Sequence, residues 1–584
     1  MKNGGQKRIG EKMGERLYDY LEITDLKDML NKTRELYGER PAYKIRIEDG
    51  KYKIFTHREI RNMVDALGTA LIDLGLKGKR IAIIGKNRYE WEIAYLSIVC
   101  GTGIVVPLDK SLPNNELEEL IERSEIEAIF YTKQYQEAIE EIRYSQKNKL
   151  KHLISIDSPI HGEGIYSQKE LIEKGRKLIE AGKKEFLNAK INAEEMAVML
   201  FTSGTTSKSK VVTLSHKNIC TNLMDLASVV DVNLEDTLLS ILPLHHVFEC
   251  TVGFLFALYK GAETVFSDGI RHIVENLKEY KVSVMANVPG IYENILTIVM
   301  KKLEKEGKLQ EVLEKEEKYK NVSMKERKEI FKEIHDMLGG RIKLFISGAA
   351  ALDSKIEEKY RDYGINLVQA YGLTETSPVV GIGSNKYHKT GTIGKALPSV
   401  EVKLANSNSE GVGELLVKGN SVMLGYYNDK VSTRETIKDG WFYTGDLAKI
   451  DEEGYIYICG RKKSVIVLKN GKNIFPEEME NLVNKIEGVT ESFVFGKQQS
   501  DDKNDIKINV QIVFDREVMK EAYKVEKDDD IYKVLSNEIK EINKKMPRYK
   551  GIRGILLTET PLKRTTTNKI KRQANLNAIE KLKN

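Results

Sequence analysis

The chain has 584 residues, too many for one hydrophobic core, so several domains are expected. Hydrophobic residues make up 41% and charged residues 31%, and 93 basic residues nearly balance 87 acidic ones. This balance is typical of a globular protein and gives little support to nucleic-acid binding. No apolar run approaches the roughly 18 residues of a membrane span, and four scattered cysteines without a C-x-x-C pair argue against disulfides or zinc. These features predict a cytoplasmic protein, with peripheral contact at a membrane surface left open.

The first third of the chain alternates between helical and strand patterns. Residues 56–76 carry apolar side chains at helical spacing, and RIAIIG at 80–85 has the pattern of a buried strand. A helix over 91–99 and strands over 103–107, 128–132 and 151–156 continue the alternation. The pattern predicts an α/β domain with a parallel sheet.

A polar loop, TSGTTSKSKVV at 202–212, follows the apolar strand pattern of 196–201 and precedes a helix expected to open within 214–218. Its hydroxyls, its backbone N–H groups and the ammonium groups of Lys208 and Lys210 suit the oxygens of a polyphosphate. The alternative is an ordinary solvated Ser/Thr loop.

The second half continues with strands and then changes character. Strand patterns at 237–241, 261–265, 282–288, 344–350 and 366–372 are separated by a Lys/Glu-rich stretch, 300–337, which predicts a solvated helical hairpin. Short strands and turns at 391–417 indicate a small β-rich subdomain. Beyond 459–465 the composition predicts a small α+β domain of about 120 residues.

Seven stretches now stand in one order: TSGTTSKSK, LPLHHVFE, SGAA, QAYGLTET, GWFYTGD, GRKKSVIVLKNGKNIFPEEME and TTTNKIKR. Together they resemble the adenylate-forming superfamily, which comprises acyl-CoA synthetases, luciferases and peptide-synthetase adenylation domains. LPLHHVFE, VPGIYENI and NGKNIFPEEME look most like the long-chain fatty acyl-CoA synthetases. The resemblance implies a large N-terminal domain, 1–460, with parallel and mixed sheets plus a β-rich subdomain, and a small mobile α+β domain, 461–584.

The resemblance also implies a binding site for ATP and Mg²⁺. The loop residues implied to hold the β- and γ-phosphates are Thr202, Ser203, Gly204, Thr205, Thr206 and Lys210. In YGLTE, Tyr371 and Gly372 would face adenine, Thr374 the α-phosphate, and Glu375 would bind Mg²⁺ as a hard oxygen ligand. Glu375 alone could equally be a helix N-terminal acid.

Further nucleotide contacts come from two other motifs. The two carboxylate oxygens of Asp446 suit the two ribose hydroxyls, and Arg461 would contact the ribose or a phosphate. Gly348, Ala349 and Ala350 are small where the backbone must pass close to a planar base.

In such enzymes the second histidine of LPLHHVFE lies beside the reacting carboxylate, so this role is expected of His246, although a structural hydrogen bond is the alternative. Lys569 in TTTNKIK is expected to bridge the developing charge on the carboxylate and α-phosphate. Residues 462–464 look like the hinge of the small domain. The loop with Lys469 and Gly471 would then admit the thiol of CoA.

Three positions depart from the usual loop TSGTTGxPKG: Ser207 and Val211 replace glycines, and Ser209 replaces proline. A β-carbon where φ must be positive costs on the order of 1 kcal/mol, and loss of the proline removes preorganisation. Because Lys210 and the hydroxyls are retained, these changes are expected to weaken pyrophosphate binding without abolishing it. Asn568 before Lys569 is a milder change, since asparagine tolerates the left-handed region.

The favoured hypothesis is an ATP- and Mg²⁺-dependent acid–thiol ligase that converts a medium- or long-chain fatty acid to acyl-AMP and then to acyl-CoA. A close alternative transfers the acyl group to the phosphopantetheine of an acyl carrier protein. A third is a non-catalytic nucleotide- or acyl-binding relative, suggested by the altered loop. Retention of Glu375, Asp446, Arg461 and Lys569 argues against the third.

Overall fold

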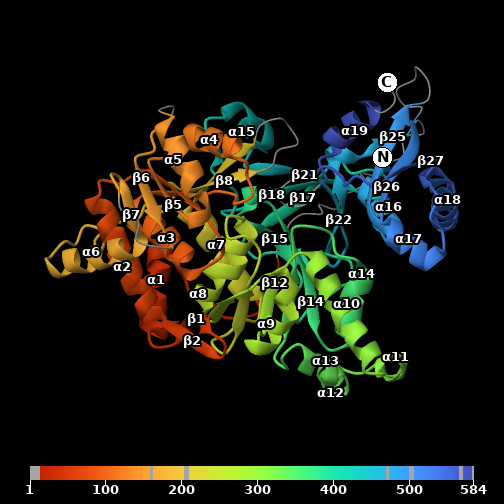
Figure 1. Ribbon diagram of the computed structural model, residues 1–584, viewed down its shortest axis with the longest axis horizontal. Helices are drawn as coiled ribbons and strands as arrows, with labels where there is room; N and C mark the ends of the chain where they lie inside the picture. The colour runs from red at the N-terminus through yellow and green to blue at the C-terminus, as the bar shows by residue number, and fades with distance from the viewer. Residues whose placement is uncertain are drawn as a thin grey trace, which may run out of the picture.

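The computed structural model describes residues 14–145, 148–157, 162–202, 209–468, 473–498, 506–564 and 570–581. Figure 1 shows a large body, which contains two long sheets, and a smaller body formed by the C-terminal part of the chain. The predicted α/β class is confirmed.

The first long sheet has eight strands in the order β19-β9-β8-β4-β3-β5-β6-β7. The strands from β8 to β7 in this order run parallel to one another, whereas β9 is antiparallel to β8. Their bounds are β3 (Arg80–Ile84), β4 (Ile104–Pro107), β5 (Ala128–Tyr131), β6 (His152–Ser155), β7 (Ile165–Ser167), β8 (Met196–Thr202), β9 (Lys210–Ser215) and β19 (Gly425–Tyr426).

The second long sheet has nine strands in the order β16-β15-β14-β13-β12-β10-β11-β1-β2. Its central strands, from β14 to β1 in this order, are parallel. The bounds are β1 (Pro41–Glu48), β2 (Lys51–Thr56), β10 (Thr237–Ser240), β11 (Glu263–Phe266), β12 (Val284–Asn287), β13 (Leu344–Ser347), β14 (Asn366–Gly372), β15 (Val379–Ile382) and β16 (Lys395–Ala396).

A layer of helices joins the two sheets. One continuous apolar cluster includes Ile83 of β3 and Ile346 of β13 together with Leu67 and Leu226 from the helices between them. Other apolar clusters cover the outer faces of the sheets. The helices of the large body are α1 (Leu26–Tyr37), α2 (His57–Asp73), α3 (Tyr89–Ser97), α4 (Asn114–Arg123), α5 (Gln136–Tyr144), α6 (Gln168–Glu180), α7 (His216–Val229), α8 (Phe256–Lys260), α9 (Ile273–Glu279), α10 (Pro289–Lys305), α11 (Leu309–Lys318), α12 (Met324–Ile330), α13 (Lys332–Met337), α14 (Ser354–Asp362) and α15 (Lys430–Thr436).

The predicted helical and largely exposed character of 300–337 is confirmed, but the stretch is not a simple hairpin. It holds the end of α10 and three short helices, because Gly307 takes a left-handed φ of 70° and Ser323 starts a new helix with a capping box. Val312, Phe331 and Ile334 are buried in the apolar cluster that packs against the second sheet, and they fix these helices to the large body.

A five-stranded antiparallel sheet forms the predicted β-rich subdomain. It contains β17 (Glu401–Ala405), β18 (Gly413–Lys418), β20 (Ile437–Lys438), β21 (Trp441–Ile450) and β22 (Ile456–Arg461). β22 leads directly into the small body through a short 3₁₀ turn, Lys462–Ser464.

The small body is built from β23 (Ile466–Val467), β24 (Asn473–Ile474), β25 (Val489–Gln498), β26 (Ile506–Phe514) and β27 (Gly554–Thr558) with α16 (Pro476–Val483), α17 (Arg516–Tyr523), α18 (Asp528–Lys544) and α19 (Arg572–Lys581). Its two apolar clusters contain only residues from Ile466 onward. The boundary between 460 and 461 stays a prediction. Within the ranges given above, no helix is both long and apolar enough to cross a membrane.

Candidate functional site

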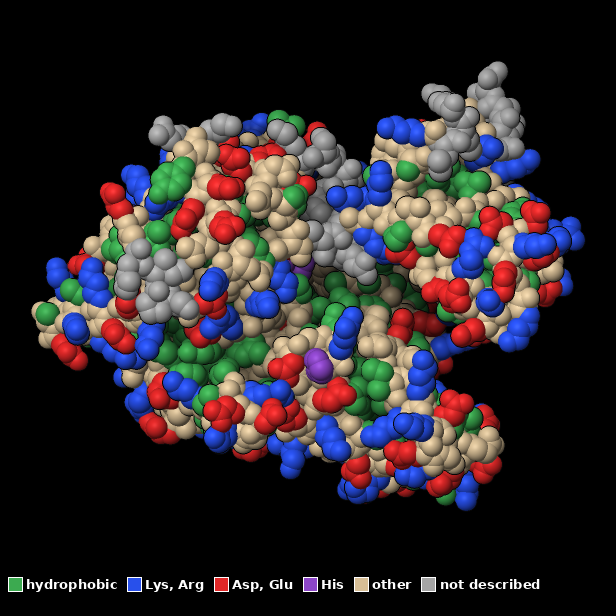
Figure 2. All heavy atoms as spheres, in the orientation of Figure 1, with side chains coloured by type: hydrophobic (Ala, Val, Ile, Leu, Met, Phe, Trp, Pro, Cys, Tyr) green, Lys and Arg blue, Asp and Glu red, His purple; other side chains and the backbone are tan. Residues whose placement is uncertain are grey.

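Four of the predicted motifs lie at the carboxyl ends of parallel strands. The phosphate loop follows β8, LPLHH follows β10, and SGAA and YGLTE follow β13 and β14. In open α/β sheets the carboxyl edge is where ligands bind. Figure 2 shows a hollow between the large and small bodies, with hydrophobic side chains on its floor and basic side chains along its rim.

The phosphate loop is the turn of a β-hairpin. Thr202 pairs with Lys210 across β8 and β9, and the Thr202 hydroxyl lies 3.4 Å from the Lys210 carbonyl oxygen. The intervening residues with predicted roles, Ser203, Gly204, Thr205 and Thr206, lie outside the described residues. The strand β9 was not predicted, and the expected helix begins after it, at His216.

Two of the residues that depart from the usual loop, Ser209 and Val211, have backbone carbonyls held by hydrogen bonds in this hairpin. Val211 is a buried β9 residue paired with Phe201, and its carbonyl accepts a 2.8 Å hydrogen bond from the Tyr427 N–H. The Ser209 carbonyl accepts from the Arg123 guanidinium at 2.9 Å. Val211 has no positive φ, so the conformational cost expected for replacing a glycine does not arise there, whereas the loss of proline at Ser209 stays untested. Ser207 lies outside the described residues.

Tyr426 connects the hairpin to the YGLTE motif. Its hydroxyl donates to the Glu375 carboxylate at 2.9 Å, and the Lys210 ammonium lies 4.5 Å from the centre of its ring. Glu375 and Thr374 belong to a short 3₁₀ turn after β14, and the Glu375 carbonyl accepts from the Met423 N–H at 2.8 Å. The lysine predicted to hold phosphate and the carboxylate predicted to hold Mg²⁺ therefore lie around one tyrosine.

Glu375 is a suitable but incomplete magnesium ligand. Across the described part of the chain, no three His, Cys, Asp or Glu side chains gather as a metal site. Mg²⁺ is commonly held by one or two carboxylates with substrate phosphates and water completing its shell. The single carboxylate beside a phosphate loop fits this mode.

Asp446 is held from both sides by the two residues predicted to share its site. Its Oδ2 accepts from the Tyr371 hydroxyl at 2.5 Å, and its Oδ1 lies 2.7 Å from the Arg461 Nε. Asp446 and Arg461 are register partners on β21 and β22. Burial, and next the nearby Asp446 charge, raise the pKa of Tyr371 well above its usual value, which keeps its hydroxyl a donor. The Asp446 carboxylate thus lies between a tyrosine hydroxyl and a guanidinium group.

The SGAA segment packs closely against Phe248. A β-carbon at Gly348 would lie 2.6 Å from the tip of the Phe248 ring, so a side chain there would displace that ring. Ala349 adopts a left-handed φ of 66°, and Ala349 and Ala350 are exposed. Strained backbone of this kind is often found at binding sites.

His246 lies in the turn after β10. Its ring centre is 4.3 Å from that of His245, whose Nε2 is 3.5 Å from the Asp109 carboxylate. The His246 N–H donates to the Pro243 carbonyl at 3.0 Å, and the His246 carbonyl accepts from Cys250. These contacts fix the backbone of the histidine pair.

Three predicted residues of the small body, Lys469, Gly471 and Lys569, lie outside the described residues.

The predicted hinge contains one contact that the sequence did not reveal. The Lys462 ammonium donates to Glu414 at 2.7 Å, and the other oxygen of this buried carboxylate accepts from the Gly445 N–H at 3.2 Å. Glu414 thus links the turn before Asp446 to the segment that leaves β22.

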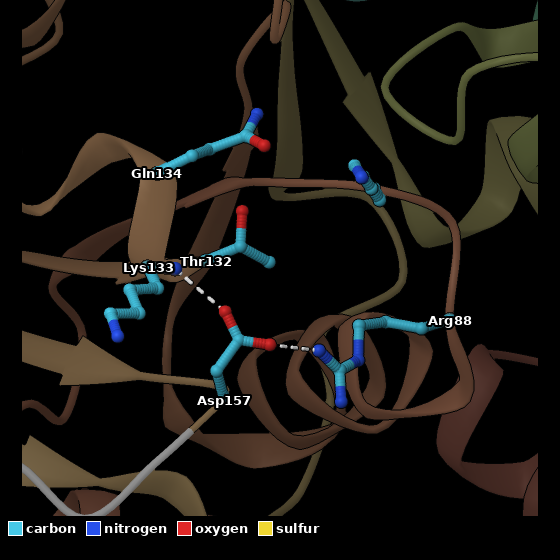
Figure 3. A pocket seen from close by; sticks show the side chains of 6 residues that line it. Arg88, Thr132, Lys133, Gln134 and Asp157 are labelled. Atoms are coloured by element: carbon cyan, nitrogen blue, oxygen red, sulfur yellow. Dashed lines mark hydrogen bonds and ion pairs between the residues drawn. The ribbon is translucent and has the colours of Figure 1, made fainter. Parts of the chain in front are cut away.

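A basic pocket of about 400 Å³ lies at the carboxyl ends of β3, β5 and β6. Figure 3 shows Arg88 and Lys133 on opposite sides of Asp157, which accepts from the Lys133 N–H at 2.6 Å and from the Arg88 guanidinium. Lys86, Thr132 and Gln134 complete the lining. The sequence analysis missed this pocket, although basic residues directly after two buried strands were a usable signal.

Two long mixed sheets with the predicted phosphate, Mg²⁺ and adenine motifs at the carboxyl ends of their parallel strands define the adenylate-forming class of enzymes. The chain belongs to the AMP-binding enzyme family. The family model described as AMP-binding enzyme matches residues 30–427, and the AMP-binding enzyme C-terminal domain matches 463–582.

Among its relatives is fatty acyl-CoA synthetase B of Dictyostelium discoideum, 30% identical over 542 residues that cover 85% of this chain and 79% of that protein. Human long-chain-fatty-acid–CoA ligase 1 is 27% identical, with 82% and 73% covered. The predicted family, including its similarity to the long-chain acyl-CoA synthetases, is confirmed.

Solved structures share the fold. ATP-bound MatB from Rhodopseudomonas palustris superposes with a TM-score of 0.73 at 21% identity, covering 96% of this chain and 99% of that one. The Mycobacterium tuberculosis fatty acyl CoA synthetase gives a TM-score of 0.65 at 20% identity, covering 95% and 98%.

Proposed function

We propose that this protein activates a medium- or long-chain fatty acid with ATP and transfers the acyl group to the thiol of CoA. The observation that carries the proposal is the presence of two side-chain clusters, Tyr371–Asp446–Arg461 and Lys210–Tyr426–Glu375, which the YGLTE segment joins by supplying Tyr371 to one and Glu375 to the other. The family match and the names of the relatives support the same reaction.

In the first half-reaction, a carboxylate oxygen of the fatty acid attacks the α-phosphorus of ATP, and pyrophosphate leaves. Asp446 would hold the ribose, and the hairpin from Thr202 to Lys210 would hold the leaving phosphates. Mg²⁺ would be held by Glu375 and would neutralise phosphate charge. Lys569 would stabilise the charge that develops between the carboxylate and the α-phosphate, and His246 would orient the carboxylate.

In the second half-reaction, the CoA sulfur attacks the acyl carbonyl carbon, and AMP leaves. The basic pocket around Lys133 supports CoA as the acceptor, because it opens at the same edge of the first sheet as the phosphate loop and presents cations suited to phosphate groups. The loop with Lys469 and Gly471 would admit the thiol after rotation about 462–464. A carrier-protein phosphopantetheine remains the alternative acceptor, and a cytoplasmic location with peripheral membrane contact is part of the proposal.

The test is fatty-acid-dependent release of pyrophosphate from ATP and Mg²⁺, with and without CoA, in the wild type and in Lys569→Ala. Lys571→Ala is a matched control, since it removes an exposed lysine two residues away. We expect release to require the acid and Mg²⁺, to fall by at least about 100-fold in Lys569→Ala, and to persist in Lys571→Ala. A panel of acids then gives chain length, and CoA against a phosphopantetheinylated carrier gives the acceptor. Nucleotide binding without release for any carboxylate would instead indicate a non-catalytic relative.

A further inference from the structure

The loop between β3 and α3 faces two different sites with consecutive residues. Lys86 and Arg88 line the basic pocket of the first sheet. Asn87, which lies between them, reaches the second sheet and contacts the segment that leads from β10 to His246. The sequence LPLHHVFE alone does not predict this contact.

Both ends of the Asn87 amide are used. Its Nδ2 donates to the Leu242 carbonyl at 2.6 Å and to the Ser240 hydroxyl at 3.0 Å, while its Oδ1 accepts from the Leu244 N–H at 3.2 Å. The Asn87 side chain therefore makes hydrogen bonds to every second residue, Ser240, Leu242 and Leu244, of the segment just before the histidine pair. Only an amide offers donors and an acceptor in this arrangement.

Glu249, which follows the histidine pair in the chain, contacts the start of the same segment. The Ser240 hydroxyl donates to its Oε1 at 2.6 Å, and the Glu249 carboxyl group is fully buried. A β-carbon at Gly253 would come within 2.7 Å of this carboxyl, so the glycine makes room for it. His246 thus lies between Leu244, which is fixed to Asn87, and Glu249, which is fixed to Ser240.

From this network we infer that Asn87 is a positioning residue for His246 during adenylation. Asn87 does not touch the reacting atoms; it fixes the turn that presents the imidazole to the fatty-acid carboxylate. The inference rests on the proposed function, in which His246 orients that carboxylate. Because misplacement of a catalytic group by about 1 Å can cost on the order of 100-fold in rate, loss of the amide should be visible in kinetics.

The experiment measures fatty-acid-dependent ATP–pyrophosphate exchange for Asn87→Asp, Asn87→Ala, His246→Ala and the double variant Asn87→Asp/His246→Ala. Asn87→Asp keeps the size of the side chain and removes both donor contacts. The matched control is Asn543→Asp, because Asn543 clamps both backbone groups of Ile552 in the small body, at 2.9 and 2.8 Å, far along the chain from the histidine turn. Thermal unfolding of each variant is recorded in parallel.

We expect Asn87→Asp and Asn87→Ala to lower the exchange rate about tenfold or more and to raise KM for the fatty acid, with KM for ATP within about twofold of the wild type. The double variant should be no more than about threefold slower than His246→Ala, since both changes remove one function. Asn543→Asp should lose stability without this kinetic pattern. If Asn87→Asp does not fold, Asn87→Ala carries the same comparison.

Fully additive losses in the double variant would overturn the inference, as would equal rises in KM for ATP and fatty acid. Wild-type exchange in the Asn87 variants beside an impaired His246→Ala would overturn it while leaving the proposed function standing. Wild-type exchange in His246→Ala would instead remove the role of His246 in the proposed function and the inference with it.

Discussion

Gly372 offers a sharp test of the nucleotide site because its surroundings leave no room for a side chain. A β-carbon at this position would lie 1.8 Å from the Pro378 carbonyl oxygen, whereas ordinary contact begins at 3.4 Å. The same oxygen accepts from the Leu373 N–H at 3.1 Å and the Thr376 hydroxyl at 2.6 Å, so it cannot move freely. In Gly372→Ala the strand that carries Tyr371 must shift.

The size of the effect follows from that overlap. The two segments must separate by about 1.5 Å, and misplacement of about 1 Å in an active site can cost on the order of 100-fold in rate. We therefore expect kcat/KM for acid-dependent pyrophosphate release to fall about 100-fold, or about 2.7 kcal/mol of transition-state stabilisation. Calorimetric titration with ATP should show weaker binding.

Gly290→Ala is the matched control, because a β-carbon there meets no atom within 4 Å and the residue lies in the first turn of α10. Its free energy of unfolding should be unchanged or higher by up to about 1 kcal/mol. A folded Gly372→Ala that releases pyrophosphate within about threefold of the wild-type rate would refute the placement of Tyr371 and Thr374 at the nucleotide.

Two further predictions concern the acceptor and pH. Lys133→Glu should raise KM for CoA about tenfold and leave CoA-independent adenylation unchanged, because a reversed charge in the basic pocket repels phosphate; an unchanged KM for CoA would contradict that use of the pocket. Burial raises the pKa of Glu249 to about 8, so its protonated form favours the folded state fully below about pH 4.5, and this stabilisation is lost as pH rises through 8. In Glu249→Gln the side chain at position 249 does not titrate. The free energy of unfolding of this variant should therefore rise relative to that of the wild type over this range, by at most about 1.4 kcal/mol per pH unit. Parallel pH profiles of the two proteins in denaturant titrations would argue against this prediction.

Asp446, Arg461 and Tyr371 were each predicted as nucleotide contacts from a separate short motif, and the structure brings their side chains into contact. Their roles toward a nucleotide stay predictions. Most strands of the two long sheets were also predicted, because buried parallel strands appear as continuous apolar runs. The adenylate-forming fold followed from the order of the motifs.

The missed features depend on contacts between distant segments. Tyr426 and Glu414 reach the site through strand pairings and ion pairs that no local pattern encodes. Asn87 holds a turn of the other sheet. Strand β9 was overlooked because the polar loop before it suggested a strand–loop–helix unit, whereas the apolar residues after Lys210 form a return strand.

The exchange of edge strands between the two sheets has a consequence for synthesis on the ribosome. The hairpin of β1 and β2 is made early, but β1 can pair with the second sheet only after β11 has been made. Strand β9 likewise pairs with β19, which is made more than 200 residues later. Long-range pairings of this kind form slowly and leave partly folded chains prone to aggregation. A nascent chain that stops before Gly425 leaves the β9 edge unpaired and open to other strands. Emergence of Tyr426 closes that edge and supplies the contacts to Glu375 and Lys210, so the same short segment completes the sheet and joins the phosphate hairpin to the YGLTE motif.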